Sequence, residues 1–213
     1  VRLLPGVSFV GVAGLVGLAF YAGQRTLSYH VLASVVATLL LLQILVTSDR
    51  DFRPGLVLLQ VLVFAFALRY TALATTPGFV GIDIWTHKTF VQEILDANSL
   101  SAIAGDKYYA SPLYHLYVGA ASVLFDASVR SALYLSLGLL MPIGAVLVYA
   151  PTGLLVGTRW AVLAAMLYAI SNYVITWSVH IIPTSQGLLF YLCIVYALVR
   201  ITRTDYDPRD YLL

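Results

Sequence analysis

Long apolar runs alternate with short polar turns along most of the chain. A membrane-spanning helix needs about 20 mainly apolar residues to cross a hydrocarbon core about 30 Å thick. By this criterion the pattern predicts six spanning helices and an all-α integral membrane protein. The predicted spans are residues 3–22, 27–46, 55–74, 128–150, 160–177 and 184–199. Arg69 falls within snorkelling distance of the far end of the third span.

A polar segment, residues 81–115, separates the third and fourth predicted spans. It holds both lysines, two of the four histidines and four of the ten acidic residues. Within it, residues 83–97 have the period of an amphipathic helix. Its apolar face comprises Ile84, Phe90, Val91, Ile94 and Leu95. Asp83 and His87 fall on this side one turn apart, where ionisable groups usually have a partner or a function.

Residues 112–125 form a shorter apolar run. As a helix, 14 residues would cover about 21 Å, which is too short to cross the hydrocarbon core. His115, Gly119, Ser122 and Asp126 recur at helical spacing and form a small or polar stripe. The pattern favours a helix lying in the membrane interface, and a short, tilted span is the alternative.

The arginines favour one orientation of the six predicted spans. Both termini and most arginines then lie on one side, which should be cytoplasmic, while the other side has only Arg25 between the first two spans. The arginines on the first side are Arg2, Arg50, Arg53, Arg159, Arg200, Arg203 and Arg209. Loop 75–127 is then extracytoplasmic, as are His30, His87, His115 and His180. We expect the plasma membrane of a prokaryote.

Composition agrees with this class. The chain of 213 residues is 61% hydrophobic and 10% charged, with a mean hydropathy of +0.90. These values exclude a disordered chain and an ordinary soluble domain. The arginines form no basic stripe, so we expect no nucleic-acid partner. Cys193 is the only cysteine, which excludes a disulfide framework. The chain begins at Val1, as expected for a fragment of a longer protein.

The residues of the polar segment allow more than one interpretation. Asp83 could be a catalytic carboxylate or only the N-cap of its helix. Asp83 and His87 could bind a metal, but two ligands make a weak signal and His87 could be only structural. Lys107 and Tyr108 could bind a phosphate or belong to an interfacial aromatic belt.

Two further residues complete the candidate substrate-binding set. Arg130 begins the fourth span from the outer side and could pair with a phosphate or simply anchor the helix. His115, on the polar stripe, is counted with Arg130, Lys107 and Tyr108 as a candidate for substrate or phosphate binding.

Three motifs in this order resemble the N-terminal module of the GT-C superfamily of membrane glycosyltransferases. They are GIDIWTH at residues 81–87, YYASPLYH at 108–115 and DASVR at 126–130; VGTRWA at 156–161 resembles the cytoplasmic turn that follows. The superfamily includes protein O-mannosyltransferases and the lipid A aminoarabinose transferase. The resemblance implies a GT-C-like module over residues 55–213, preceded by an additional transmembrane hairpin, residues 1–54.

The resemblance also implies a function. These enzymes transfer a sugar from a polyprenyl-phosphate donor to a protein or lipid acceptor at the extracytoplasmic face. Asp83 would be the catalytic base, or the ligand of a divalent cation such as Mg²⁺ or Mn²⁺, and Arg130 would lie near the active cavity. The chain departs from relatives in having Ser111 where many have a second proline, and Gln186 where an acid is common.

Two other classes remain as alternatives. A non-catalytic membrane assembly subunit could use the loop as a partner surface. A transporter is less favoured, because coupled carriers usually have intramembrane acids. The predicted spans contain no Asp or Glu, and their polar residues include Gln43, Gln60, Asn172 and hydroxyl side chains.

Overall fold

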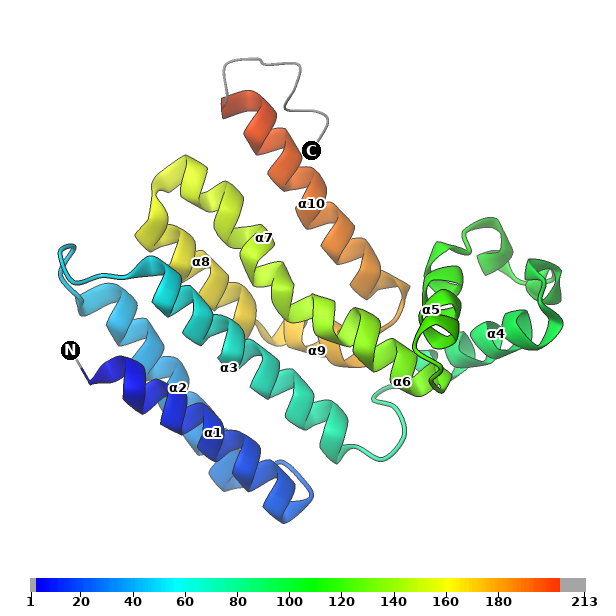
Figure 1. The fold of residues 1–213 in the computed structure, drawn as a ribbon, viewed down its shortest axis with the longest axis horizontal. Helices are drawn as coiled ribbons and strands as arrows, with labels where there is room; N and C mark the ends of the chain where they lie inside the picture. Colours follow the sequence, from blue (N-terminus) through cyan, green and yellow to red (C-terminus); the bar gives the residue numbers. More distant parts are fainter. Residues whose placement is uncertain (1–2, 204–213) are drawn as a thin grey trace.

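The computed structural model describes residues 3–203, in which 83% of the chain is helical and no strand occurs (Figure 1). The helices are α1 (Leu4–Ala22), α2 (Leu27–Val46), α3 (Pro54–Thr75), α4 (Asp83–Ala97), α5 (Leu113–Leu124), α6 (Val129–Leu133), α7 (Leu139–Val156), α8 (Thr158–Ile170), α9 (Asn172–His180) and α10 (Pro183–Arg203). The short turns η1 (Leu100–Ile103) and η2 (Lys107–Ala110) join α4 to α5, and η3 (Tyr134–Gly138) joins α6 to α7. The all-helical prediction is confirmed for the described residues.

The predicted spans correspond to the long apolar helices. α2 begins and ends at the predicted residues, and α1, α3 and α10 begin within one residue of the predicted bounds. In the described part of the chain, five helices are long and apolar enough to cross a membrane, and a bent helix pair raises the number to six. The fold is therefore all-helical in the described residues and compatible with a multi-pass membrane protein.

The fourth predicted span is one apolar helix with a defect. α6, η3 and α7 form a continuous stretch of 28 residues, Val129–Val156. η3 is a turn of π-helix, the wider helical turn that occurs mostly as single bulges within α-helices. α7 then packs closely against α8, because a Cβ atom at Gly144 would lie 2.1 Å from the hydroxyl of Tyr168.

The fifth predicted span is not one continuous helix. α8 and α9 meet at Ser171 with a bend of 56°. A break of this kind leaves carbonyl oxygens at the end of α8 without helical partners. Arg69 of α3 supplies a donor, because its Nη1 donates to the carbonyls of Ala169 and Ala65, both at 3.1 Å. Arg69 is 1% exposed. The expectation that it snorkels to the end of α3 is therefore wrong.

One end of the helix bundle, called the arginine end below, is held together by side-chain bonds between two turns. At the arginine end, the α7–α8 turn meets the α2–α3 turn, because Arg159 donates to the carbonyl of Thr47 at 2.6 Å and pairs with Asp49 at 2.9 Å. Arg50 and Arg53 lie in the same α2–α3 turn. Of the other arginines predicted for this side, Arg2 and Arg209 lie outside the described residues.

The loop end carries α4, η1, η2 and α5, which project from the helix bundle in Figure 1. α5 is joined to the turn between α9 and α10 by Tyr114, whose hydroxyl donates to the carbonyl of Ile181. Three of the four residues of the small or polar stripe of α5 face the protein interior, and the placement of this helix in the membrane interface stays a prediction. His115, Gly119 and Ser122 are buried, and a Cβ atom at Gly119 would contact Leu95 of α4 at 3.7 Å. The stripe therefore packs against α4.

The N-terminal hairpin is not an isolated unit. α1 and α2 share one hydrophobic core with α3 and α8, which includes Leu15, Leu40, Phe64 and Met166. A second core joins the loop helices to α6, α7, α9 and the end of α3. The division of the chain at residue 54 stays a prediction.

The Tyr114 hydroxyl bond should contribute measurably to stability. Tyr114→Phe leaves the buried carbonyl of Ile181 without this donor, so we expect a loss of about 1 to 3 kcal/mol in the free energy of unfolding. Tyr109→Phe removes the same atom from a side chain that is 44% exposed and should change little. Thermal unfolding of both variants in detergent measures the difference, and equal effects would contradict the assigned role.

Candidate active site

The apolar face of α4 folds as its sequence pattern predicts. Ile84, Val91 and Ile94 are buried, and Phe90 and Leu95 are partly buried. His87 is buried with them at 4% exposure, whereas Asp83 is exposed. Asp83 is therefore not packed against the rest of the protein, although it falls on the apolar side of the helical pattern.

The exposure of Asp83 follows from its place in the helix. It is the first residue of α4, and helical side chains tilt toward the N-terminus, so the carboxylate projects beyond the end of the helix instead of against α5. Ile82, not Asp83, is the N-cap residue, and it makes no side-chain capping bond. Asp83 instead places a negative charge in the first helical turn, where it interacts favourably with the helix dipole.

Asp83 lies in a pocket that is completed by a distant part of the chain. The pocket has a volume of about 360 Å³ and is lined by the segment Val80–Ile84 together with His180 and Ile182. Gly81 permits this arrangement, because its φ is +92° and a Cβ atom on it would lie 3.3 Å from the His180 ring. The six predicted spans place His180 on the outer side, but no spacing along the chain associates it with Asp83. The fold joins the two residues, which are almost 100 positions apart.

His87 is paired with the other histidine of the loop. Its Nδ1 and the Nε2 of His115 share a hydrogen bond of 3.0 Å, and His115 is fully buried. The rings of Phe90, Tyr108 and Tyr114 surround the pair. The geometry matches the structural interpretation of His87.

Burial sets the charge state of both histidines. Burial lowers the pKa of His87, partly offset by the nearby charge of Asp83. Burial, followed by the proximity of His87, lowers the pKa of His115 to about 4. Both rings are therefore neutral at pH 7, and His115 does not bind a phosphate as a cation there.

Arg130 holds the segment between α3 and α4. Its Nε donates to the carbonyl of Gly78 at 2.9 Å, its Nη2 donates to that of Thr76 at 3.3 Å, and its guanidinium lies 4.9 Å from the ring centre of Tyr134. The hydroxyl of Tyr134 also donates to Gly78, at 2.8 Å. Arg130 thus fixes the backbone at Gly78, five residues before Asp83.

The predicted site residues form two groups. His87, His115 and Tyr108 lie together, with the ammonium of Lys107 5.1 Å from the ring centre of Tyr108. Asp83, one helical turn before His87, lines a separate pocket with His180. Residues 3–203 contain no group of three or more His, Cys, Asp or Glu side chains that could hold a metal. The arrangement of Asp83 and His87 does not provide a protein-built site for Mg²⁺ or Mn²⁺, and their metal role stays a prediction.

Comparison with known proteins gives no closer assignment. No protein-family model matches the chain, and no curated protein or solved structure matches it.

The histidine pair predicts a pH-dependent stability. A histidine of the unfolded chain has a pKa of about 6.5. Because both folded-state pKa values are lower, the stabilisation is complete above about pH 6.5 and declines as pH falls toward the folded-state values. The slope is at most about 1.4 kcal/mol per pH unit for each histidine. Thermal unfolding between pH 7.5 and pH 5 should show this decline.

Two matched variants test whether the histidine pair causes this decline in stability at low pH. His87→Gln/His115→Gln should flatten the pH dependence, while His30→Gln, at an exposed position, should leave it unchanged. An unchanged slope in the double variant would contradict the assignment.

Proposed function

We propose that this chain is the membrane module of a glycosyltransferase that uses a polyprenyl-phosphate-linked sugar. The observation that carries the proposal is the exposed Asp83 carboxylate in a pocket with His180, at the end of a bundle of long apolar helices. The sequence motifs that resemble the GT-C superfamily include both this carboxylate and Arg130. The donor is a lipid, so a reactive group close to the membrane surface suits it.

The reaction needs a base beside the sugar. The acceptor oxygen attacks the anomeric carbon, the bond from that carbon to the phosphate oxygen breaks, and polyprenyl phosphate leaves. Asp83 accepts the proton of the acceptor hydroxyl, which keeps the proton balance of the step. A positioned carboxylate can serve as such a base. General acid–base catalysis by a side chain within hydrogen-bond reach typically increases the reaction rate by about 10²- to 10⁴-fold.

The cations of the loop would assist the departing phosphate. Arginine has a permanently charged, forked group suited to phosphate oxygens. Arg130 is partly buried beside the segment that leads into Asp83. Lys107 lies in η2, the turn that precedes α5. A protein or lipid acceptor would approach from the water side of the loop, and the polyprenyl chain would lie along the apolar helices.

Asp83→Asn tests the catalytic role. The substitution keeps the shape of the side chain and removes its basicity, so transfer should fall by at least about 10²-fold. Asp83 makes no capping bond, so thermal stability should change little. The assay measures consumption of polyprenyl-phosphate mannose and polyprenyl-phosphate glucose by the purified protein, reconstituted into lipid vesicles with protein and lipid acceptors.

Glu93→Gln is the matched control. Glu93 is exposed on the same helix, away from the Asp83 pocket, and its neutralisation should leave transfer nearly intact. Equal activity of Asp83→Asn and the unaltered protein would contradict the base assignment. An unaltered protein that consumes neither donor would favour the non-catalytic assembly subunit.

The same proposal includes an orientation. Six crossings, with α8 and α9 as one broken span, place the arginine end in the cytoplasm and the loop end outside. In a Cys193→Ala background, Ala97→Cys should react with an impermeant thiol reagent added to intact cells. Arg50→Cys should react only after the cells are opened. The reverse pattern would overturn the orientation.

A further inference from the structure

His180 brings a hydrogen-bond donor to the Asp83 pocket. The pocket volume of about 360 Å³ lies within the range of small-ligand sites, which is about 300 to 1,000 Å³. Besides the Asp83 carboxylate and the His180 imidazole, the lining has Gly81 and the aliphatic side chains of Val80, Ile82, Ile84 and Ile182. A ligand in this pocket therefore has a side-chain acceptor on the α4 side and a side-chain donor on the α9 side.

Neither of these two polar groups is bound within the fold. The Asp83 carboxylate and both ring nitrogens of His180 have no hydrogen-bond partner within residues 3–203. The His180 ring packs edge-on against Trp177, with ring centres 6.0 Å apart. Asp83 is exposed and His180 is partly exposed, so a ligand can reach both side chains. Two accessible, unpartnered ionisable groups in one pocket indicate a functional site.

The Nε2 edge of the His180 ring faces the segment that leads into Asp83. A Cβ atom built on Gly81 would lie 3.3 Å from Cε1, 3.3 Å from Nε2 and 3.4 Å from Cδ2, the three atoms of this edge. Because glycine has no side chain, the space in front of Nε2 stays open. Nε2 is therefore the ring nitrogen that a ligand beside Asp83 would contact.

The turn after His180 holds the ring in place. Ile181 has a φ of +49°, in the left-handed region that β-branched residues rarely adopt. The Tyr114 hydroxyl donates to the carbonyl of Ile181. The Ser185 hydroxyl donates to the carbonyl of Trp177 at 2.6 Å, which ties the start of α10 to α9. Backbone strain of this kind is concentrated at sites where the geometry serves a function.

The proposed reaction needs a donor opposite its base. In a direct displacement, the acceptor oxygen and the phosphate oxygen lie on opposite sides of the anomeric carbon. Negative charge grows on the phosphate oxygen as its bond to that carbon breaks, and a hydrogen-bond donor placed there stabilises the transition state. The Asp83 carboxylate is on the acceptor side, and it would repel a phosphate next to it. The imidazole across the pocket is suited to the phosphate.

We propose that the Nε2–H group of His180 donates a hydrogen bond to the phosphate of the polyprenyl-phosphate donor. The imidazole keeps its proton while polyprenyl phosphate leaves, so the proton balance of the transfer is unchanged. This inference rests on the proposed function and adds His180 to Asp83 as a second catalytic residue. Arg130 and Lys107 are not among the lining residues, so their charges act on the phosphate from outside the pocket.

Two substitutions separate this hydrogen bond from a packing role. His180→Gln keeps an N–H donor near the position of Nε2 and loses the ring, whereas His180→Phe keeps a ring against Trp177 and loses the donor. Titration of the purified full chain in detergent with polyprenyl phosphate measures the affinity. His180→Phe should weaken binding about tenfold or more, as expected for loss of a donor to a charged group, and His180→Gln should bind more tightly than His180→Phe. The reverse order, or equal affinities of both variants and the unaltered protein, would overturn the proposal.

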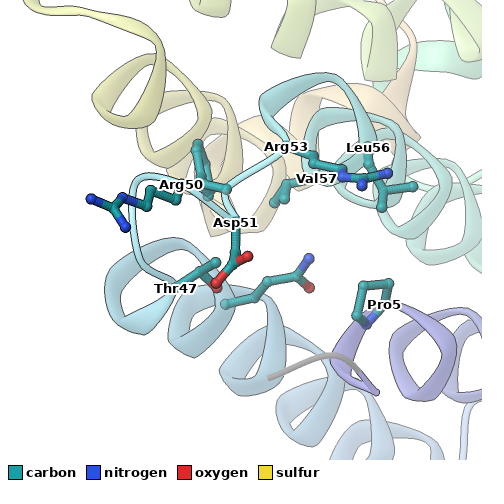
Figure 2. Close-up of a pocket in the computed structure, with 9 residues that line it drawn as sticks. Pro5, Thr47, Arg50, Asp51, Arg53, Leu56 and Val57 are labelled. Atoms are coloured by element: carbon teal, nitrogen blue, oxygen red, sulfur yellow. The ribbon is translucent and has the colours of Figure 1, made fainter.

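The pocket at the arginine end provides the matched control. Figure 2 shows this pocket, which has a volume of about 420 Å³ and whose lining includes Arg50 and Arg53. Its arginines would also attract a phosphate. Arg53→Gln should nevertheless leave the affinity for polyprenyl phosphate unchanged, and a loss as large as that in His180→Phe would overturn the assignment to His180. The polyprenol that lacks the phosphate should bind equally to His180→Phe and to the unaltered protein.

The transfer assay separates this inference from the proposed function. His180→Phe should lower kcat by about 10²-fold, with a smaller change in KM. An unaltered protein that binds polyprenyl phosphate through His180 but transfers no sugar would contradict the transferase and keep the phosphate site. Transfer at the full rate by His180→Phe would keep the transferase and overturn the role of His180. An unaltered protein that binds no polyprenyl phosphate would overturn it as well.

Discussion

The structure depends on a buried guanidinium at the point where the fifth span breaks. Arg69 donates from α3 to the last turn of α8, and its Nε and Nη2 have no partner within residues 3–203. A charge within a membrane protein is costly unless it is compensated, and the carbonyl end of a helix carries partial negative charge. The break at Ser171 therefore provides an electrostatic partner for Arg69, and Arg69 satisfies a carbonyl that the break exposes.

The bend determines the geometry of the loop end. α9 leaves α8 at 56°, and its last residue, His180, reaches the backbone of Gly81. The next residue, Ile181, accepts the Tyr114 bond from α5. A straight helix would continue along the direction of α8 and provide neither contact. The pocket of Asp83 thus depends on a break within the fifth predicted span.

Backbone carbonyls accept side-chain bonds that join packed elements at both ends of the helix bundle. Arg130 bonds to Thr76 and Gly78 after the end of α3, Tyr114 bonds to Ile181 after the end of α9, and at the other end of the bundle Arg159 bonds to Thr47 after the end of α2. Each acceptor lies where a helix has ended and its carbonyl lacks a helical partner. Long polar side chains therefore satisfy the backbone and fix the packing at once. The Asp83 pocket lies beside such a helix end.

The sequence alone determined the helical class, most helix bounds and the buried face of α4. These features follow from apolar length and from the 3.6-residue period, which are local properties of the chain. The sequence also indicated Asp83 and Arg130, through motifs and the end of an apolar run. Tertiary structure decided the rest: the pairing of His87 with His115, the approach of His180 to Asp83, and the burial of Arg69. Each depends on which helix ends meet in space, and no spacing along the chain encodes the direction that a helix takes after a break.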